Sequence, residues 1–225
     1  MSNDEILLIA DQRVLSIPVI DNHEPLFNLI NQTEIVCGPS PEIPNNTDYT
    51  QMRERVYQKL LEAQKLLPEG LRFCLYESYR SLDLQKTLFD NRYQKIQKKY
   101  PDWPHESLFL ETIKLVSPVV NLDGSQNIPP HATGAAVDVY LIDRKGHPIE
   151  MGIHPKDWME DTDGLISQTD SSGISKEAQE NRELMSKVLS AVGFENYPTE
   201  YWHWSYGDRY WAYMSSQPNA IYGVV

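Results

Sequence analysis

Two histidines and two carboxylates stand at spacings that could build a catalytic metal site. In HATGAAVD, His131 is followed seven residues later by Asp138, which lies inside an apolar run. A carboxylate in such a run is costly to bury unless it is paired or coordinated. A tight turn at Gly134 would bring the two side chains together. In TEYWHWSYGD, Glu200 and His203 lie three residues apart in an aromatic segment.

His131, Asp138 and His203 together offer three nitrogen or oxygen ligands, the number that catalytic zinc characteristically takes from protein. Glu200 would then be the general base, which deprotonates the water in the fourth position and later protonates the leaving amine. On a regular strand, residues i and i+3 face opposite sides, so this role requires Glu200 at a strand edge or a bulge before His203. The alternatives are a capped turn at His131 and an aromatic strand with an incidental histidine.

Arg80, in YESYRSLDLQ, stands between a predicted strand and a predicted helix, where a cation could reach into a cleft. A guanidinium there would stabilise the oxyanion of a tetrahedral intermediate. The alternative is a structural arginine that covers apolar surface or pairs with Glu77 or Asp83. The residues themselves leave both interpretations open.

Hydrophobic periodicity predicts the elements that would position these residues. Helical spacing is found at 48–67, 81–100, 105–116 and 175–194, the last with Ser175 as N-cap and Gly193 as its stop. Strand-like patterns are found at 71–79, 135–143 and 200–207. A polar loop is expected at 151–174, and long loops in compact domains are often functional.

These elements predict an α+β fold in one domain, residues 1–225. Its sheet is expected to be small and mainly antiparallel, with helices flanking it. Residues 1–48 would form an N-terminal segment of short strands and loops that wraps a catalytic core, residues 49–225.

The net charge is −12, from 32 acidic and 20 basic residues. Nucleic-acid binders normally carry a basic face, so a nucleic-acid partner is not expected, whereas a cationic or zwitterionic small ligand is compatible. No stretch approaches the roughly 18 apolar residues of a membrane span. Asp4 and Glu5 stand where a secretory signal carries Lys or Arg, which predicts a cytoplasmic protein.

The motifs ESYRS, HATGAAVDV, GISKEAQENRELM and VGFENYPTEYWHWSYGDRYWAY, in this order, resemble the D-alanyl-D-alanine dipeptidase family of zinc metallopeptidases. That family includes the dipeptidase of vancomycin resistance and is related in fold to D,D-carboxypeptidases and the hedgehog domain. The resemblance implies one zinc ion per chain, with His131, Asp138 and His203 as its ligands. It implies Glu200 as the catalytic base and Arg80 as the group that stabilises the transition state. The expected reaction is zinc-dependent hydrolysis of D-Ala-D-Ala or a similar short D-amino-acid dipeptide.

The substrate side of the pattern departs from this family. Pro129 stands where many members carry a serine that helps to bind the free amine of the dipeptide, and Pro130 also replaces a residue near the substrate. The family stretch MGTxFD, whose aspartate binds that amine, here reads MGIHPKD, with Asp157 as the closest candidate for substrate binding.

Two other functions remain open on the sequence. The lost serine favours a D,D- or L,D-carboxypeptidase that acts on longer peptidoglycan stem peptides, which present no free amine at that position. A non-catalytic zinc-binding module is the second alternative. Retention of Glu200 and Arg80 argues against it, since a structural site needs neither.

Overall fold

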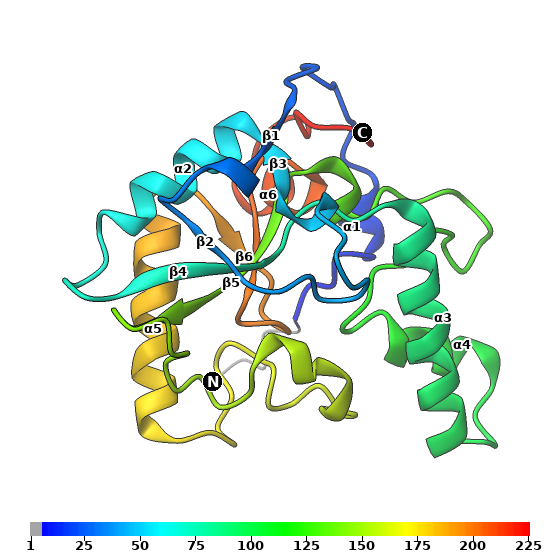
Figure 1. Ribbon diagram of the computed structural model, residues 1–225. Coiled ribbons are helices and arrows are strands. Elements are labelled where there is room, and N and C mark those ends of the chain that lie inside the picture. The colour runs from blue at the N-terminus through cyan, green and yellow to red at the C-terminus, as the bar shows by residue number, and fades with distance from the viewer. Residues whose placement is uncertain (1–5) are drawn as a thin grey trace.

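A computed structural model describes residues 6–225, so Asp4 and Glu5, on which the cytoplasmic prediction depends, lie outside the described residues. At its centre is a five-stranded sheet in the order β2-β4-β5-β7-β6 (Figure 1). Strand β2 runs parallel to β4, and the other neighbouring pairs are antiparallel. The predicted α+β class with a mainly antiparallel sheet is therefore confirmed. The strands are β2 Val36–Cys37, β4 Arg72–Glu77, β5 Ala136–Ile142, β6 Glu195–Asn196 and β7 His203–Ser205.

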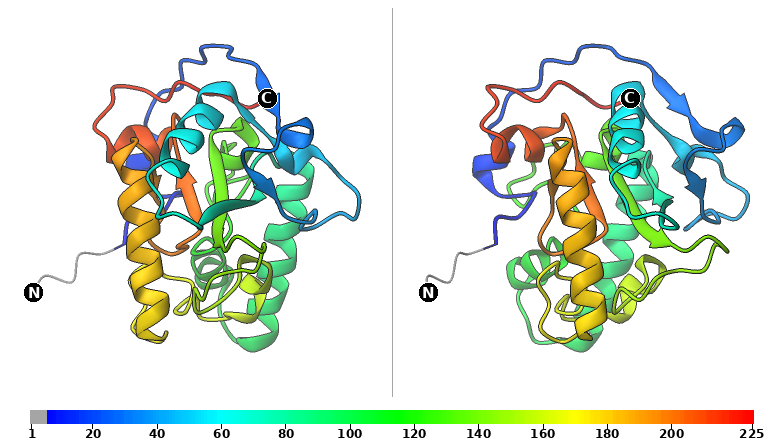
Figure 2. Two further views of the ribbon diagram at one scale, coloured as in Figure 1. Left: turned by 60° about the vertical axis from the view of Figure 1, so that its left-hand side comes forward. Right: turned by 90° about the vertical axis from the view of Figure 1, so that its left-hand side faces the viewer.

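Helices α2 (Glu54–Gln64) and α5 (Lys176–Ala191) pack with one face of this sheet in the main hydrophobic core (Figure 2). Successive side chains of a strand point to opposite faces, so alternate residues of β5 enter the core: Val137, Val139 and Leu141. Each fully buried aliphatic side chain contributes about 1.5–3 kcal/mol. The burial of these side chains holds the sheet against the two helices. The intervening residue Asp138 points to the other face of the sheet, away from the core.

Helices α3 (Leu82–Lys99) and α4 (His105–Thr112) pack together on the side of the molecule away from α5 (Figure 1). The predicted loop 151–174 carries a 3₁₀ helix, η4 (Pro155–Glu160). Two buried arginines hold this loop through its carbonyl oxygens. Arg92 donates to Thr162 at 3.0 Å, and Arg182 donates to Met151 at 2.9 Å. The loop is thus anchored at several points, although it has little regular structure.

The prediction of a helix over residues 48–67 is wrong at its start. Asp48–Thr50 forms a 3₁₀ turn, η2, and Gln51–Arg53 forms strand β3, which pairs with β1 (Leu26–Asn28). The apolar residue Met52 is buried because it sits in this strand opposite Phe27, not because it lies on a helix face. A buried apolar residue fits both periods, so the sequence pattern could not separate them.

The remaining predicted elements are present with shorter bounds. Ser175 caps α5 by accepting a hydrogen bond from the Ala178 amide at 3.1 Å, as expected. The aromatic strand predicted over 200–207 shrinks to β7, because Glu200 begins a turn in which its carbonyl accepts from the His203 amide at 3.1 Å. Two short helices that the periodicity did not indicate complete the chain: α1 (Gln12–Leu15) and α6 (Arg209–Met214). Among residues 6–225, no helix has the length and apolarity needed to cross a membrane.

Candidate metal centre

Three adjacent strands place ionisable side chains in one row across the sheet. Asp138 of β5 lies directly opposite His203 of β7 and opposite Glu77 of β4. Leu75 points into the main core, and in a regular strand Glu77 would follow it there. A register shift between Leu75 and Glu77 interrupts this alternation. Such a bulge re-aims a side chain, and Glu77 is thereby brought to the side of the sheet that carries Asp138.

His131 reaches this row from a 3₁₀ turn, η3 (Pro130–Thr133), which ends at Gly134. Gly134 has φ +69, and a Cβ there would lie 2.5 Å from Leu26 Cδ2, so glycine is required both for the turn and for the close approach. Arg53 fixes the same turn: its Nε donates to the Thr133 carbonyl at 2.7 Å. The predicted tight turn between His131 and Asp138 is therefore present.

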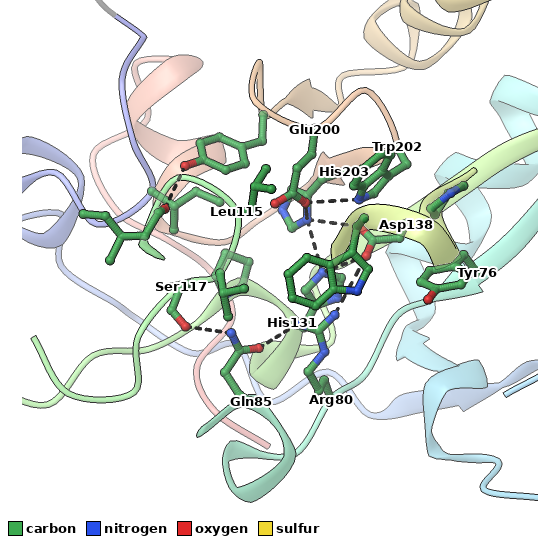
Figure 3. Close-up of a pocket in the computed structure, with 17 residues that line it drawn as sticks. Tyr76, Arg80, Gln85, Leu115, Ser117, His131, Asp138, Glu200, Trp202 and His203 are labelled. Carbon is green, nitrogen blue, oxygen red and sulfur yellow. Dashed lines mark hydrogen bonds and ion pairs between the residues drawn. The ribbon is translucent and has the colours of Figure 1, made fainter. Parts of the chain in front are cut away.

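The candidate ligand atoms of His131, Asp138 and His203 converge on one buried point (Figure 3). His131 Nε2 lies 3.2 Å from His203 Nδ1 and 3.4 Å from Asp138 Oδ2, and His203 Nδ1 lies 3.1 Å from Asp138 Oδ1. Ligand atoms arranged tetrahedrally around zinc, with bonds of about 2.0–2.2 Å, are about 3.3–3.6 Å apart. One of the three separations lies within this range and the other two are 0.1–0.2 Å below it, so the three side chains fit a zinc-sized ion after small shifts.

The protonation of the two imidazoles agrees with this interpretation. His131 Nδ1 lies 2.7 Å from the Ser78 carbonyl, which can only accept, so Nδ1 carries the proton and Nε2 presents its lone pair to the centre. His203 Nε2 is buried and has no hydrogen-bond partner among residues 6–225. The other ring nitrogen, Nδ1, is the one that lies near His131 Nε2 and Asp138 Oδ1, so Nδ1 is the candidate ligand atom of His203.

Glu200 lies beside the three candidate ligands rather than among them. Its Oε2 is 4.0 Å from His203 Nδ1 and accepts a hydrogen bond from the Trp202 indole at 3.1 Å. The turn that precedes β7 sets this position, which is the strand-edge arrangement that the sequence required. The i and i+3 residues can therefore face one site.

Arg80 lies on the opposite side of the three candidate ligands from Glu200 (Figure 3). Its guanidinium forms an ion pair with Glu77, donates to Gln85 Oε1 at 2.9 Å and lies 4.0 Å from Asp138 Oδ2. The structural alternative, pairing with Glu77, is thus observed. However, the Arg80 Nε is buried with no hydrogen-bond partner among the residues described, which leaves a donor beside the cavity.

Burial and neighbouring charge act in opposite directions on the ionisable groups here. Burial alone would raise the pKa of Asp138, but the imidazoles of His131 and His203 hold that pKa below its usual range. Burial would lower the pKa of Arg80, and the negative charges of Glu77 and Asp138 raise it instead. Burial and then the charge of Asp138 raise the pKa of Glu200. Asp138 and Arg80 are therefore charged at neutral pH.

One cavity is lined by the five predicted site residues Arg80, His131, Asp138, Glu200 and His203. Other residues that the sequence did not indicate line it as well. Tyr76, Trp158 and Tyr197 form aromatic walls, and Gln85 holds Arg80. The structure brings in Trp158 from η4, which the loop prediction alone could not place. Glu77 could have been found from the sequence. It is a carboxylate in the apolar run RFCLYES, and such a group is costly to bury unless it is paired, as for Asp138.

Asp157 does not join this site. Its side chain is solvent-exposed on η4 and is absent from the cavity wall, whereas its neighbours Pro155 and Trp158 line the cavity. The amide of Asp157 bonds to the His154 carbonyl at 2.9 Å, a turn that directs successive side chains apart. The structure therefore does not bring Asp157 together with the other predicted site residues, and its role in substrate binding stays a prediction.

A comparison with family models matches residues 46–221 to a peptidase family described as D-Ala-D-Ala dipeptidase. The chain belongs to this family. Its predicted class, a metallopeptidase, is thereby confirmed. A D-alanyl-D-alanine dipeptidase from Synechocystis sp. is 25% identical to this chain. The alignment has 225 positions, gaps included, and spans 90% of this chain and 90% of that protein.

The fold of this chain was also compared with solved structures, and two of those that match are peptidases. One is VanYB in complex with D-alanine-D-alanine, with a TM-score of 0.45, 15% identity and coverage of 80% of this chain and 85% of that one. Another is a vancomycin resistance D,D-pentapeptidase, VanY, in complex with Zn(II), with a TM-score of 0.43 and 13% identity. It covers 80% of this chain and 86% of its own.

Proposed function

We propose that this protein hydrolyses the peptide bond of D-Ala-D-Ala, or of a similarly short D-amino-acid dipeptide, with one zinc ion per chain. The observation that carries the proposal is the convergence of three candidate ligand atoms, 3.1–3.4 Å apart, between Glu200 and Arg80 in one cavity. Membership of the D-Ala-D-Ala dipeptidase family supports the substrate class.

In this proposal, His131, Asp138 and His203 hold the metal. Two imidazoles and one carboxylate suit zinc, although such a donor set accepts other divalent ions as well. When bound there, zinc supplies Lewis acidity, which polarises a carbonyl group and lowers the pKa of water. Three protein ligands leave room for reactants, as catalytic sites require.

Glu200 takes a proton from the attacking water and gives it to the leaving amine nitrogen. Its position suits this role, because its carboxylate borders the candidate ligands and is oriented by the Trp202 indole. Arg80 faces the cavity from the other side, where its buried donors stabilise the oxyanion of the tetrahedral intermediate. Glu77 and Gln85 hold the guanidinium in that position.

The test is a substrate panel on the zinc-loaded protein. We expect release of D-alanine from D-Ala-D-Ala and none from L-Ala-L-Ala, and we expect a chelator to abolish the activity. Faster cleavage of a muramyl pentapeptide than of D-Ala-D-Ala would replace the proposal with a carboxypeptidase. Zinc binding without hydrolysis of any peptide would replace it with a non-catalytic module.

A further inference from the structure

A glutamate from the N-terminal part of the chain lies next to the metal cavity. Glu42 belongs to the proline-rich stretch GPSPEIPNN, residues 38–46, between β2 and η2. Its side chain is half-buried and lines a cleft together with Glu77 and Arg80. Arg80 also lines the metal cavity, so the cleft and the cavity adjoin at this guanidinium.

Electrostatic interactions link the Glu42 carboxylate to three side chains of the cavity wall. Burial raises the pKa of Glu42, and the nearby Arg80 and Trp158 side chains oppose that shift. Burial and then the charge of Glu42 raise the pKa of Tyr76. Tyr76, Arg80 and Trp158 all line the metal cavity. Glu42 itself does not line the metal cavity; it borders the cavity through Arg80, which lines both the cavity and the cleft of Glu42.

The charges around the cavity leave Glu42 without a cation of its own. The carboxylates of Asp138 and Glu200 line the cavity, and those of Glu42 and Glu77 line the adjoining cleft. Glu77 is paired with Arg80, and Asp138 lies between two imidazoles. Among the residues that the structure describes, no Lys, Arg or His nitrogen lies within 4 Å of the Glu42 carboxylate. A hydrogen bond with the Trp158 side chain acts to lower the pKa of Glu42, but the carboxylate has no ion-pair partner among these residues. A half-buried carboxylate without an ion pair attracts a cationic group from a ligand.

We propose that Glu42 binds the free α-ammonium group of the substrate and so selects peptides with an unblocked amine. This inference rests on the proposed function and narrows it to dipeptides over stem peptides, whose corresponding nitrogen is an uncharged amide. Asp157, the candidate from the family pattern, is exposed and does not line the cavity. The N-terminal segment therefore supplies the specificity-determining carboxylate.

The test compares D-Ala-D-Ala with propanoyl-D-alanine, the same molecule with its amine replaced by hydrogen. For Glu42→Gln we expect kcat/KM for D-Ala-D-Ala to fall about tenfold, mainly through KM, because one charge-assisted hydrogen bond is lost. Hydrolysis of propanoyl-D-alanine should not change. Glu42→Asp keeps the charge and should lose less. Glu54→Gln removes one charge at an exposed position on α2 and serves as the matched control, with no effect on either substrate.

A binding measurement separates this inference from the proposed function. In the zinc-loaded Glu200→Gln background, calorimetry should show D-Ala-D-Ala bound about tenfold more weakly after Glu42→Gln, and propanoyl-D-alanine bound equally. Equal loss for both ligands, or no loss for D-Ala-D-Ala, would overturn the role of Glu42. Failure of the wild-type protein to cleave D-Ala-D-Ala would refute the proposed reaction, and the binding comparison would still decide on Glu42.

Discussion

Replacement of Arg80 by alanine should have two separable effects, one on folding and one on catalysis. Glu77, the ion-pair partner of Arg80, is only 1% exposed. Removing one partner of a buried ion pair typically costs about 3–5 kcal/mol, because the other charge stays buried. For a chain of this size, we expect Tm to fall by roughly 6–20 °C. Loss of one oxyanion donor lowers kcat by about 10²–10³.

The double variant Arg80→Ala/Glu77→Gln separates the two effects. It removes the buried negative charge together with its partner, so most of the lost stability should return. It restores no donor beside the cavity, so kcat should stay about 10²–10³ below wild type. The measurements are urea unfolding of each variant and the rate of D-alanine release from D-Ala-D-Ala, with zinc saturating throughout.

Recovery of kcat together with stability in the double variant would refute the oxyanion role of Arg80. Arg80 would then act only by neutralising Glu77, which is the structural alternative that the sequence left open. An unchanged kcat in a folded Arg80→Ala protein would also reject its role at the oxyanion. Recovery of neither quantity would show that Glu77 is not the source of the instability.

Three further predictions concern the base, the metal and the turn. Glu200→Gln should keep the Trp202 hydrogen bond and the bound zinc but lower kcat by about 10²–10⁴; loss of zinc in elemental analysis would make Glu200 a ligand. Chelation should lower the free energy of unfolding by about 2.7 kcal/mol relative to zinc at 100-fold its Kd, or roughly 5–11 °C in Tm; an unchanged melting curve would contradict the metal site. Gly134→Ala should destabilise the protein by at least about 1 kcal/mol, since φ is +69 and the new Cβ meets Leu26. It should also weaken zinc binding through His131, and unchanged zinc affinity would reject that link.

Two of the candidate ligands carried a local signal in the sequence, and the resemblance to the dipeptidase family joined His203 to them. Asp138 is a carboxylate inside an apolar strand, and His131 precedes a glycine that can turn the chain back toward it. Strand alternation then places Asp138 on the face opposite the core. These arguments need only neighbouring residues, and the observed turn and register agree with them.

Residues that depend on contacts distant in sequence could not be predicted in the same way. The helix expected from residue 48 begins at Glu54, because pairing with β1 draws residues 51–53 into a strand. Trp158 lines the cavity from a loop that buried Arg92 and Arg182 anchor through hydrogen bonds to its carbonyls. Glu42 shares a cleft with Arg80, 38 positions away in the chain, and has no local pattern that marks it.

The proposed metal ligands and the proposed substrate contacts belong to parts of the fold that differ in how tightly they are packed. Asp138 and His203 project from strands whose opposite face lies in the main core, so moving them would disturb the packing of Val137 and Trp204. Glu42 and Trp158 instead come from segments outside the sheet, where replacements and insertions cost less. If the proposed roles are right, substrate contacts can change without loss of the candidate ligands. That would account for a sequence that matches the family pattern at the candidate ligands yet departs from it at Pro129 and over 151–157.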